Sequence, residues 1–384
     1  MNNNQVLEQF DAWLNDDNPF AALVMRQWLM PVEGKDAVIF PPTYPIEGEK
    51  TGYNIDRFED GSSVCQIDSV GSQANRMEPI FKRERYSKLV PQVIIEAGDK
   101  KVNLLDAGHR AADAIVRFSN LAPQLEEAFR ELQIGGDAEP LARLAPTSLV
   151  FGVWDSRSTQ AKVPRIIRST IRAFNVNELH KSAQYIPPVD YVGEDLVMKA
   201  EGTRANEALS EQGFLHNPKG AWTHGGVSVH GEFRRDAILN LVALHALGVS
   251  KNANSENELE LRRYILGLSF VALTAPQDGF LRQDCFIVPD ADRPAQWQLV
   301  SHDGKSESNV AYSHSDVLTF AKAAADSFGV KQPEGPYRFD PEFAREWLDL
   351  SPDDRKRLAR QGGVTKEAVR QFKAKKPQGS RRTA

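Results

Sequence analysis

Residues 148–174 read SLVFGVWDSRSTQAKVPRIIRSTIRAF, an apolar run followed by a basic segment. Between Ser156 and Phe174 there are five cationic residues and no acidic one, although the whole chain has a net charge of −5. The five cations are Arg157, Lys162, Arg165, Arg168 and Arg172. Because Arg pairs with phosphate through two parallel hydrogen bonds, this composition favours a segment that contacts a polyanion.

The spacing within the segment predicts a strand over residues 148–154 and a helix that begins at Pro164. Arg165, Arg168 and Arg172 are spaced i, i+3, i+7, which would place them on one face of that helix. Proline suits the first turn, where its missing N–H group is not needed. The opposite face would carry Ile166, Ile167, Ile171 and Phe174. The alternative is an ordinary solvated helix face whose cations are paired with acids elsewhere in the fold.

Bulk composition places the chain among globular proteins. It has 384 residues, of which 41% are hydrophobic and 26% charged, enough for one large or two ordinary domains. No apolar run approaches the roughly 20 residues that a membrane span needs, and residues 1–5 lack the layout of a signal peptide. Cys65 and Cys285 are the only cysteines, which disfavours a disulfide scaffold and suits a reducing compartment. We therefore expect a cytoplasmic protein.

Charge is unevenly distributed along the chain. Residues 353–384 contain eleven Lys and Arg residues and three acidic residues, which gives this tail a net charge of +8 and leaves −13 on the rest. Such asymmetry predicts either a nucleic-acid contact or a solubilising tail. Residues 377–384 are polar and basic, and we expect them to be disordered.

Hydrophobic periodicity and turn residues predict an α+β or mixed α/β chain, since strands and helices alternate irregularly. Strands are expected within residues 20–40, 213–233 and 269–289, and at 63–67, 93–97, 101–105 and 296–300. Helices are expected at 6–14, 69–77, 109–118, 122–132, 196–210, 234–247, 256–268, 316–328, 341–350, 352–360 and 365–374.

A metal site is one chemical alternative. His109 and Asp113 would lie one helical turn apart, and Asp68 and Asp106 could complete a ligand set. Against it, only one histidine is present and no second ligand follows at helical spacing. The chain contains no GxSxG, GxxxxGK[ST] or HExxH motif, so the sequence predicts neither a catalytic site nor a metal.

Three polar loops that carry cations follow expected strands, at residues 68–76, 106–110 and 154–162. Each combines Arg with small residues and with amide or hydroxyl donors, a mixture that suits contacts to a sugar–phosphate backbone. The neighbouring Asp68, Asp106, Asp113 and Asp155 are expected to orient these arginines. The candidate contact residues are Gln73, Asn75, Arg76, His109, Arg110, Arg157, Gln160, Lys162, Arg165, Arg168 and Arg172.

Several stretches resemble one protein family. They are DSVGSQANRME (68–78), LLDAGHRAADA (104–114), APTSLVFG (145–152), WDSRSTQAKVPR (154–165) and SAQY (182–185). Together they resemble the CRISPR-associated RAMP backbone subunits of type I-U, or I-G, Cascade effector complexes, which belong to the Cas-seven superfamily. The resemblance extends from about residue 42 to 192 and continues more weakly to about 330.

The resemblance implies a fold and a role. The fold would be an α+β palm of modified RRM or ferredoxin-like type, an antiparallel sheet flanked by helices, with a thumb hairpin and helical insertions. This palm would span residues 1–340, and residues 341–384 would form a basic helical tail. The role would be that of a non-catalytic RNA-binding subunit in antiviral defence. Base pairing, rather than the protein, would then supply specificity.

Partners also follow from the resemblance. Several copies would stack in a helical filament along the CRISPR RNA and present it to a complementary target DNA strand. Further partners would be the large subunit, the fused subunit that processes and caps the guide, and a recruited helicase–nuclease, with no cofactor and no membrane. The alternative is a metal-dependent ribonuclease on the same fold, which would use Asp68, Asp106, His109 or Asp113 and cleave RNA only with a divalent metal.

Overall fold

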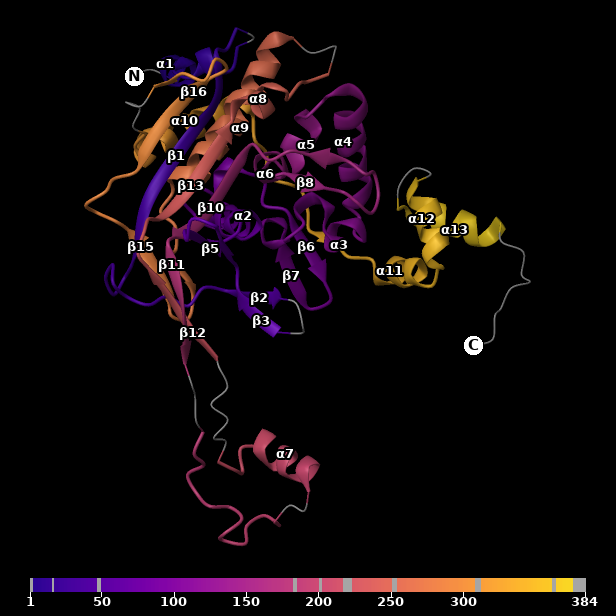
Figure 1. The fold of residues 1–384 in the computed structure, drawn as a ribbon. Coiled ribbons are helices and arrows are strands. Elements are labelled where there is room, and N and C mark those ends of the chain that lie inside the picture. Colours follow the sequence, from indigo (N-terminus) through magenta and orange to yellow (C-terminus); the bar gives the residue numbers. More distant parts are fainter. Residues whose placement is uncertain are drawn as a thin grey trace.

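A computed structural model describes residues 3–15, 17–46, 50–181, 185–199, 202–216, 223–250, 254–307, 312–360 and 364–375. The chain forms a curled antiparallel sheet with helices packed against one of its faces (Figure 1). This arrangement confirms the expected α+β class and is consistent with an RRM or ferredoxin-like palm.

The main sheet runs through the whole body of the molecule. In the described residues it has nine strands, and every neighbouring pair is antiparallel. The central path is β14 (Phe280–Arg282), β15 (Cys285–Pro289), β1 (Phe20–Pro31), β13 (Phe233–Asn240), β10 (Ile167–Phe174), β5 (Ser63–Asp68) and β4 (Ile55–Arg57). β16 (Gln296–Ser301) also pairs with β1, and β17 (Ser306–Glu307) pairs with β16.

One face of the sheet forms the main hydrophobic core. Register places Leu23 of β1 opposite Leu239 of β13, and Leu239 opposite Ile167 of β10; all three are buried. Side chains alternate between the two faces of a strand, so this register assigns every second residue to the core. α9 (Ser255–Thr274) and α10 (His314–Phe328) pack together and join this core.

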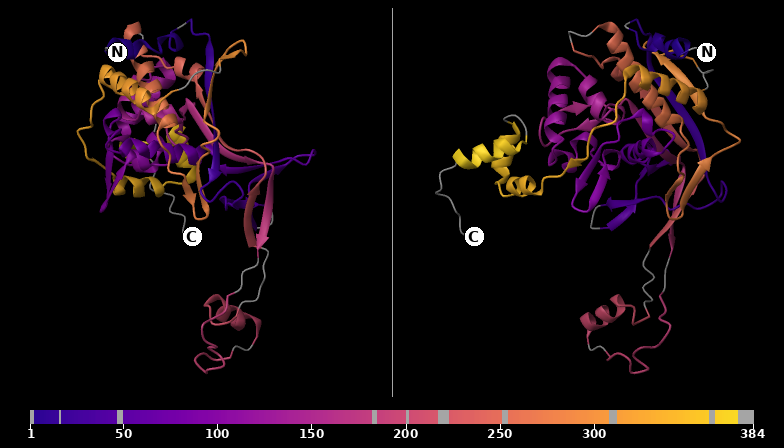
Figure 2. Two further views of the ribbon diagram at one scale, coloured as in Figure 1. Left: turned by 90° about the vertical axis from the view of Figure 1, so that its left-hand side faces the viewer. Right: turned by 180° about the vertical axis from the view of Figure 1, so that it is seen from behind.

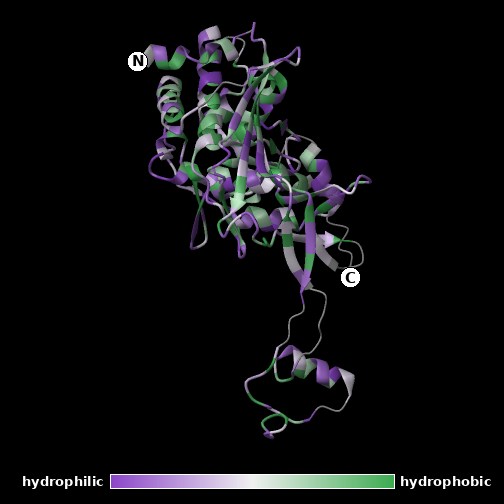
Figure 3. Ribbon diagram, turned by 60° about the vertical axis from the view of Figure 1, so that its left-hand side comes forward, coloured by the Kyte–Doolittle hydropathy of each residue, from purple (hydrophilic) through white to green (hydrophobic). Residues whose placement is uncertain are grey.

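Shorter helices complete the helical side of the body. The helix α2 (Val70–Met77) follows β5. Ser69 caps its N-terminus, because the Ser69 side chain accepts a hydrogen bond from the Ser72 N–H group. The set consists of α1 (Asn3–Glu8), α2 (Val70–Met77), α3 (Ala114–Arg117), α4 (Ala122–Gly135), α5 (Glu139–Leu144), α6 (Thr147–Phe151) and α8 (Leu241–His245). Figure 3 shows that hydrophobic residues are concentrated in this body.

A long hairpin projects from the body. It consists of β11 (Val176–Lys181) and β12 (Thr223–Val229), and α7 (Thr203–Glu211) lies in the connection at its far end (Figures 1 and 2). Small sheets surround the main one. They are β2 (Thr43–Ile46) with β3 (Lys50–Tyr53), β6 (Ile94–Ala97) with β7 (Lys100–Asn103) and β18 (Tyr337–Arg338), and β8 (Val153–Trp154) with β9 (Lys162–Val163).

Three C-terminal helices pack against the body through a separate apolar cluster. They are α11 (Pro341–Leu348), α12 (Pro352–Arg360) and α13 (Lys366–Lys375), close to the expected bounds. Trp347 and Val369 of these helices join Phe118, which precedes α4, in one cluster. The expected disorder of residues 377–384 lies outside the described residues.

Two expected helices are in fact strands. Residues 167–174 form β10, because IRSTIRAF also fits a period of two: Ile167, Ser169 and Ile171 are buried while Arg168 is exposed. Likewise β13 occupies residues 233–240, and only α8 is helical within the expected helix at 234–247. β-branched residues in the first segment favour the strand.

Other boundaries differ as well. The expected strand at 148–154 is mostly α6, followed by the two-residue strand β8. The expected helix at 109–118 is broken into a 3₁₀ turn and α3, since the Asp113 side chain caps a new helix by accepting from the Ile115 N–H group. Further differences are at the ends of α1 and α7, at residues 104 and 105, which lie in a 3₁₀ turn after β7, and at residues 269–274, which extend α9.

We expect Gly267→Ala to lower the free energy of unfolding by about 1–3 kcal/mol. A Cβ at Gly267 of α9 would lie 2.9 Å from Cα of Ala321 in α10, so the two helices would have to separate. Gly135→Ala is the matched control, because Gly135 is also a helical glycine, at the end of α4, but a Cβ there meets nothing within 4 Å. Urea unfolding measures both variants, and equal stability of the two would contradict this packing.

Candidate nucleic-acid interface

The face of the main sheet opposite the helices is the open face, and it carries several arginines. Since Ile167, Ser169 and Ile171 of β10 point into the core, Arg168, Thr170 and Arg172 point to the open face, where Arg168 is exposed, Arg172 is half-buried and Thr170 is buried. Register with β13 places Arg172 opposite Arg234 and Thr170 opposite Asp236. Two of the sequence-predicted candidates, Arg168 and Arg172, are thus brought to one surface, although by a strand rather than by a helix.

A third arginine joins this face from β1. Arg26 is exposed and lies opposite Asp236 of β13 in the register. None of Arg26, Arg168 and Arg172 forms an ion pair with any residue in the described part of the chain. Uncompensated arginines on an otherwise acidic protein mark a surface that can receive phosphates.

Arg234 differs from these three because its charge is compensated. Its guanidinium forms ion pairs with Glu232 and, at 3.0 Å from Nε to Oδ1, with Asp236. The same group lies over the ring of Phe174, with its Cζ 4.5 Å from the ring centroid. Trp28 donates a hydrogen bond to Glu232 over 3.1 Å. This network holds Arg234, Phe174 and Trp28 in contact with protein groups beside the free arginines.

Two candidate residues are in the interior. Gln73 is 3% exposed; its Nε2 donates to Asp68 Oδ2 over 2.6 Å, and its Oε1 accepts from Ser169 Oγ over 2.9 Å. Arg110 is 6% exposed, and its Nε lies 2.7 Å from Glu78 Oε2. Both side chains are therefore occupied by protein groups.

The Arg110–Glu78 pair is a buried ion pair. Burial raises the pKa of Glu78 to about 7, even though Arg110 acts in the opposite direction. Burial also lowers the pKa of Arg110, while Glu78 raises it. Each charge is thus removed from water and depends on the other, which is typical of a structural pair.

The loop at residues 68–76 has two of its expected features, an arginine oriented by an acid and an exposed amide side chain. Arg76 donates to Asp68 Oδ2 over 3.1 Å and to the Leu281 carbonyl over 2.9 Å, so Asp68 orients this arginine as expected. Asn75 is exposed, and its Oδ1 accepts from Arg110 over 3.4 Å. Its exposure leaves the side chain accessible at the surface.

The other expected acid–arginine pairs are not formed. Asp106 pairs with Lys82, with its carboxylate 2.5 Å from Nζ, and Asp113 lies 3.5 Å from Nδ1 of the exposed His109. Asp155 instead accepts hydrogen bonds from the N–H groups of Ser158 and Thr159. For these acids the prediction was wrong, because they satisfy turns and other cations.

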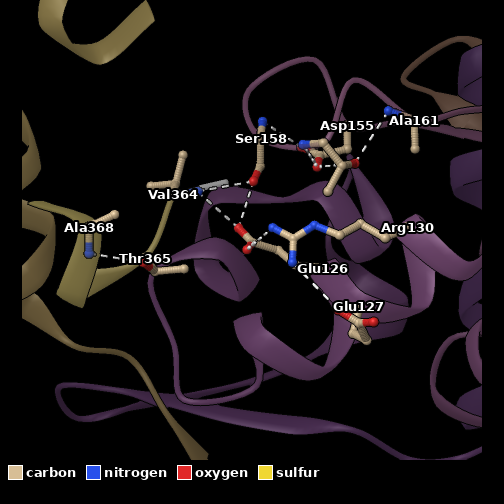
Figure 4. A network of polar contacts seen from close by, with 10 residues as sticks. Glu126, Glu127, Arg130, Asp155, Ser158, Ala161, Val364, Thr365 and Ala368 are labelled. Carbon is tan, nitrogen blue, oxygen red and sulfur yellow. Dashed lines mark hydrogen bonds and ion pairs between the residues drawn. The ribbon is translucent and has the colours of Figure 1, made fainter. Parts of the chain in front are cut away.

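Residues 154–162 form a braced loop between β8 and β9. Asp155 holds the turn from inside, and Ser158 Oγ donates to Glu126 Oε1 over 2.6 Å. The Val364 N–H group donates to the same Glu126 oxygen over 3.1 Å, which ties the C-terminal segment to the loop (Figure 4). Arg157 and Gln160 are exposed on the outside of this loop, and Lys162 Nζ lies 4.8 Å from the Trp154 ring centroid.

The candidate residues therefore do not form one surface. Arg168 and Arg172 share the open face, Arg157, Gln160 and Lys162 share the braced loop, and Gln73 and Arg110 are interior. Arg165 is exposed between the loop and β10. Sequence analysis missed Arg26, whose signal is a lone cation within the apolar run of residues 20–31.

No group of three His, Cys, Asp or Glu side chains suited to a metal ion occurs among the described residues. Asp68, Asp106 and His109 are held by separate partners, as given above. Cys65 and Cys285 are both buried and free, and burial raises the pKa of each thiol. No described helix is long and apolar enough to cross a membrane.

We expect Arg110→Ala to lower the free energy of unfolding by about 3–5 kcal/mol, because it leaves Glu78 buried without its partner. The double variant Arg110→Met/Glu78→Leu should recover most of that loss, since it removes both charges and keeps apolar volume. Arg157→Ala, at an exposed position, should stay within about 0.5 kcal/mol of the parent chain. Urea unfolding compares them; an unaffected Arg110→Ala variant would show that the pair is not structural.

A family model matches part of the chain, and the matched part includes the basic segment at residues 156–174. Residues 23–178 match the family model of CRISPR-associated protein GSU0053 (Cas_GSU0053). The matched region begins within β1, ends within β11 and includes Arg26, Arg168 and Arg172. No curated protein matches the chain. The similarity supports a CRISPR-associated protein and a role in CRISPR defence.

Proposed function

We propose that this chain is a non-catalytic CRISPR RNA-binding backbone subunit of an effector complex. The observation that carries the proposal is the open face of the sheet, where Arg26, Arg168 and Arg172 lie unpaired within the region similar to the CRISPR-associated family. The finer assignment, to the Cas-seven superfamily and to type I-U or I-G Cascade complexes, rests on the sequence resemblance.

The chemistry of the open face suits an RNA backbone. Residues four apart on a strand lie about 13 Å apart on the same side, so Arg168 and Arg172 can contact separate phosphates of one strand. Each guanidinium offers bidentate hydrogen bonds to phosphate without reading the base. The bases are thereby left free to pair with a target strand, and sequence specificity resides in the guide.

The projecting hairpin suits assembly into a filament. α7, at the far end of the hairpin, lies well beyond the body, where a neighbouring copy along the guide can contact it (Figure 2). We propose that this hairpin is the thumb and that several copies stack along one guide RNA. The large subunit, the fused guide-processing and capping subunit, the target DNA strand and a recruited helicase–nuclease complete the proposed set of partners in the cytoplasm.

The experiment that tests the proposal is co-expression of the chain with its neighbouring subunits and a CRISPR array, followed by purification and sequencing of the bound RNA. Guide RNA of uniform length in a complex with several copies of this chain is the expected result. Recovery of the chain as a monomer free of nucleic acid would contradict it. Incubating the complex with Mg²⁺ tests the ribonuclease alternative, because metal-dependent RNA cleavage that Asp68→Ala abolishes would favour an enzyme.

We expect Arg168→Ala/Arg172→Ala to weaken RNA binding and to reduce its salt dependence. Two fewer phosphate contacts should lower the slope of log affinity against log salt by about 1.4 for a single strand. Lys322→Ala/Lys331→Ala removes the same charge from exposed positions in and just after α10, on the helical side, and should leave the slope unchanged. Filter binding over a salt series measures both, and equal slopes for the two double variants would contradict the site.

A further inference from the structure

A cavity of about 820 Å³ lies between the braced loop and the C-terminal helices. Residues of the loop form one wall, residues of α11 and α12 form the other, and Arg117 and Phe118 contribute the floor. Among its lining residues are Arg117, Trp154, Arg157, Trp347, Arg355 and Lys356. The Val364 hydrogen bonds to Glu126 and Ser158 hold the two walls together (Figure 4).

The cavity is cationic and lacks a matching acid. Its lining contains four cationic residues and no acidic one. Arg157, Arg355 and Lys356 form no ion pair with any residue that the structure describes. Repulsion among neighbouring cations opposes folding, so this arrangement is most stable with an anion between them.

Arg117 provides a second and independent sign of a missing ligand. Its Nη2 donates to the Ala112 carbonyl over 2.9 Å, but its Nε is buried without a hydrogen-bond partner. Burial lowers the pKa of this guanidinium and the nearby Arg157 lowers it further, while Asp155 raises it. A buried donor without an acceptor is destabilising, and an anionic ligand would satisfy it.

The aromatic residues that line the cavity indicate which class of anion it can bind. Trp154 is 56% exposed at the rim, and the ring already has a cation, Lys162, on one face. Phe118 and Trp347 are almost completely buried and close the apolar side of the cavity. Exposed aromatic rings next to arginines form the stacking platforms that bind single-stranded nucleic acid, because bases stack on the ring while cations hold the phosphates.

We propose that this cavity binds a short stretch of single-stranded nucleic acid, with a base stacked on Trp154 and phosphates held by Arg117, Arg157 and Arg355. The site shares no residue with the open face, and its helices lie on the flank of the body away from β1 and β16 (Figure 1). The chain thus contacts nucleic acid at two places. Nucleic-acid binding at this cavity does not depend on the proposed binding of guide RNA at the open face.

The test measures binding of fluorescein-labelled 12-nucleotide RNA and DNA of one sequence to the full-length chain by anisotropy. All variants carry Arg26→Ala/Arg168→Ala/Arg172→Ala, which removes the three unpaired arginines of the open face. We expect Trp154→Ala and Arg157→Ala/Arg355→Ala each to weaken binding at least tenfold, and Lys322→Ala/Lys331→Ala to leave it unchanged. Circular dichroism confirms that the variants are folded, since the replaced side chains lie at the surface.

The outcomes separate this inference from the proposed function. Tighter binding of RNA identifies an RNA segment as the ligand, tighter binding of DNA identifies a DNA strand, and either supports the inference. Unchanged binding in both pocket variants overturns it. So does equal competition by polyglutamate of the same charge, which would indicate an acidic protein partner. Guide RNA should still co-purify with a complex that contains the pocket variants. Failure to recover guide RNA with the parent chain would contradict the proposed function, whereas the oligonucleotide measurement tests the cavity alone.

Discussion

The pairing of β10 between β13 and β5 is the constraint on which the rest of the structure depends. Once this strand is fixed, its pleat directs Ile167, Ser169 and Ile171 to the helices and Arg168 and Arg172 to the opposite side. A shift of one residue in register would exchange the two sets and bury both arginines. Because the core face is closely packed, that alternative is excluded, and the cationic open face follows from the packing of the other face.

A buried polar chain reinforces this register. Arg235 of β13 donates from Nε to Ser169 Oγ of β10 over 2.9 Å, and Ser169 donates in turn to Gln73 of α2. Gln73 then donates to Asp68, which also binds Arg76. Burial lowers the pKa of Arg235 to about 10, so this side chain stays charged at neutral pH. The chain connects two strands and a helix, and it explains why Gln73 serves the fold rather than a ligand.

Local sequence patterns predicted much of the architecture. Strands β1 and β5, the β6–β7 hairpin, and helices α2, α9 and α10 all have clear periodicity or capping residues and are formed as expected. β10 could not be assigned in this way, because RIIRSTIRAF satisfies both a helical spacing of arginines and a strand alternation. Only its neighbours β13 and β5, which are distant in sequence, decide between them.

The site was predicted less completely, for a related reason. Composition shows that Arg110 is cationic, but its buried partner Glu78 lies 32 positions away in the sequence, and nothing local distinguishes this arginine from an exposed one. Arg157 and Arg165 are candidate contact residues by sequence, yet they lie in the braced loop and beside it rather than on the open face. The cavity beside that loop depends on α11 and α12, about 200 residues further along the chain, and no local motif indicates it.

The most direct measurement is ultraviolet cross-linking of the purified ribonucleoprotein followed by mass spectrometry of the cross-linked peptides. The account predicts RNA cross-links in peptides from β1, β10 and β13, where Trp28, Phe174 and their neighbouring arginines line the open face. Cross-links confined to α9 and α10, on the opposite side of the sheet, would contradict it.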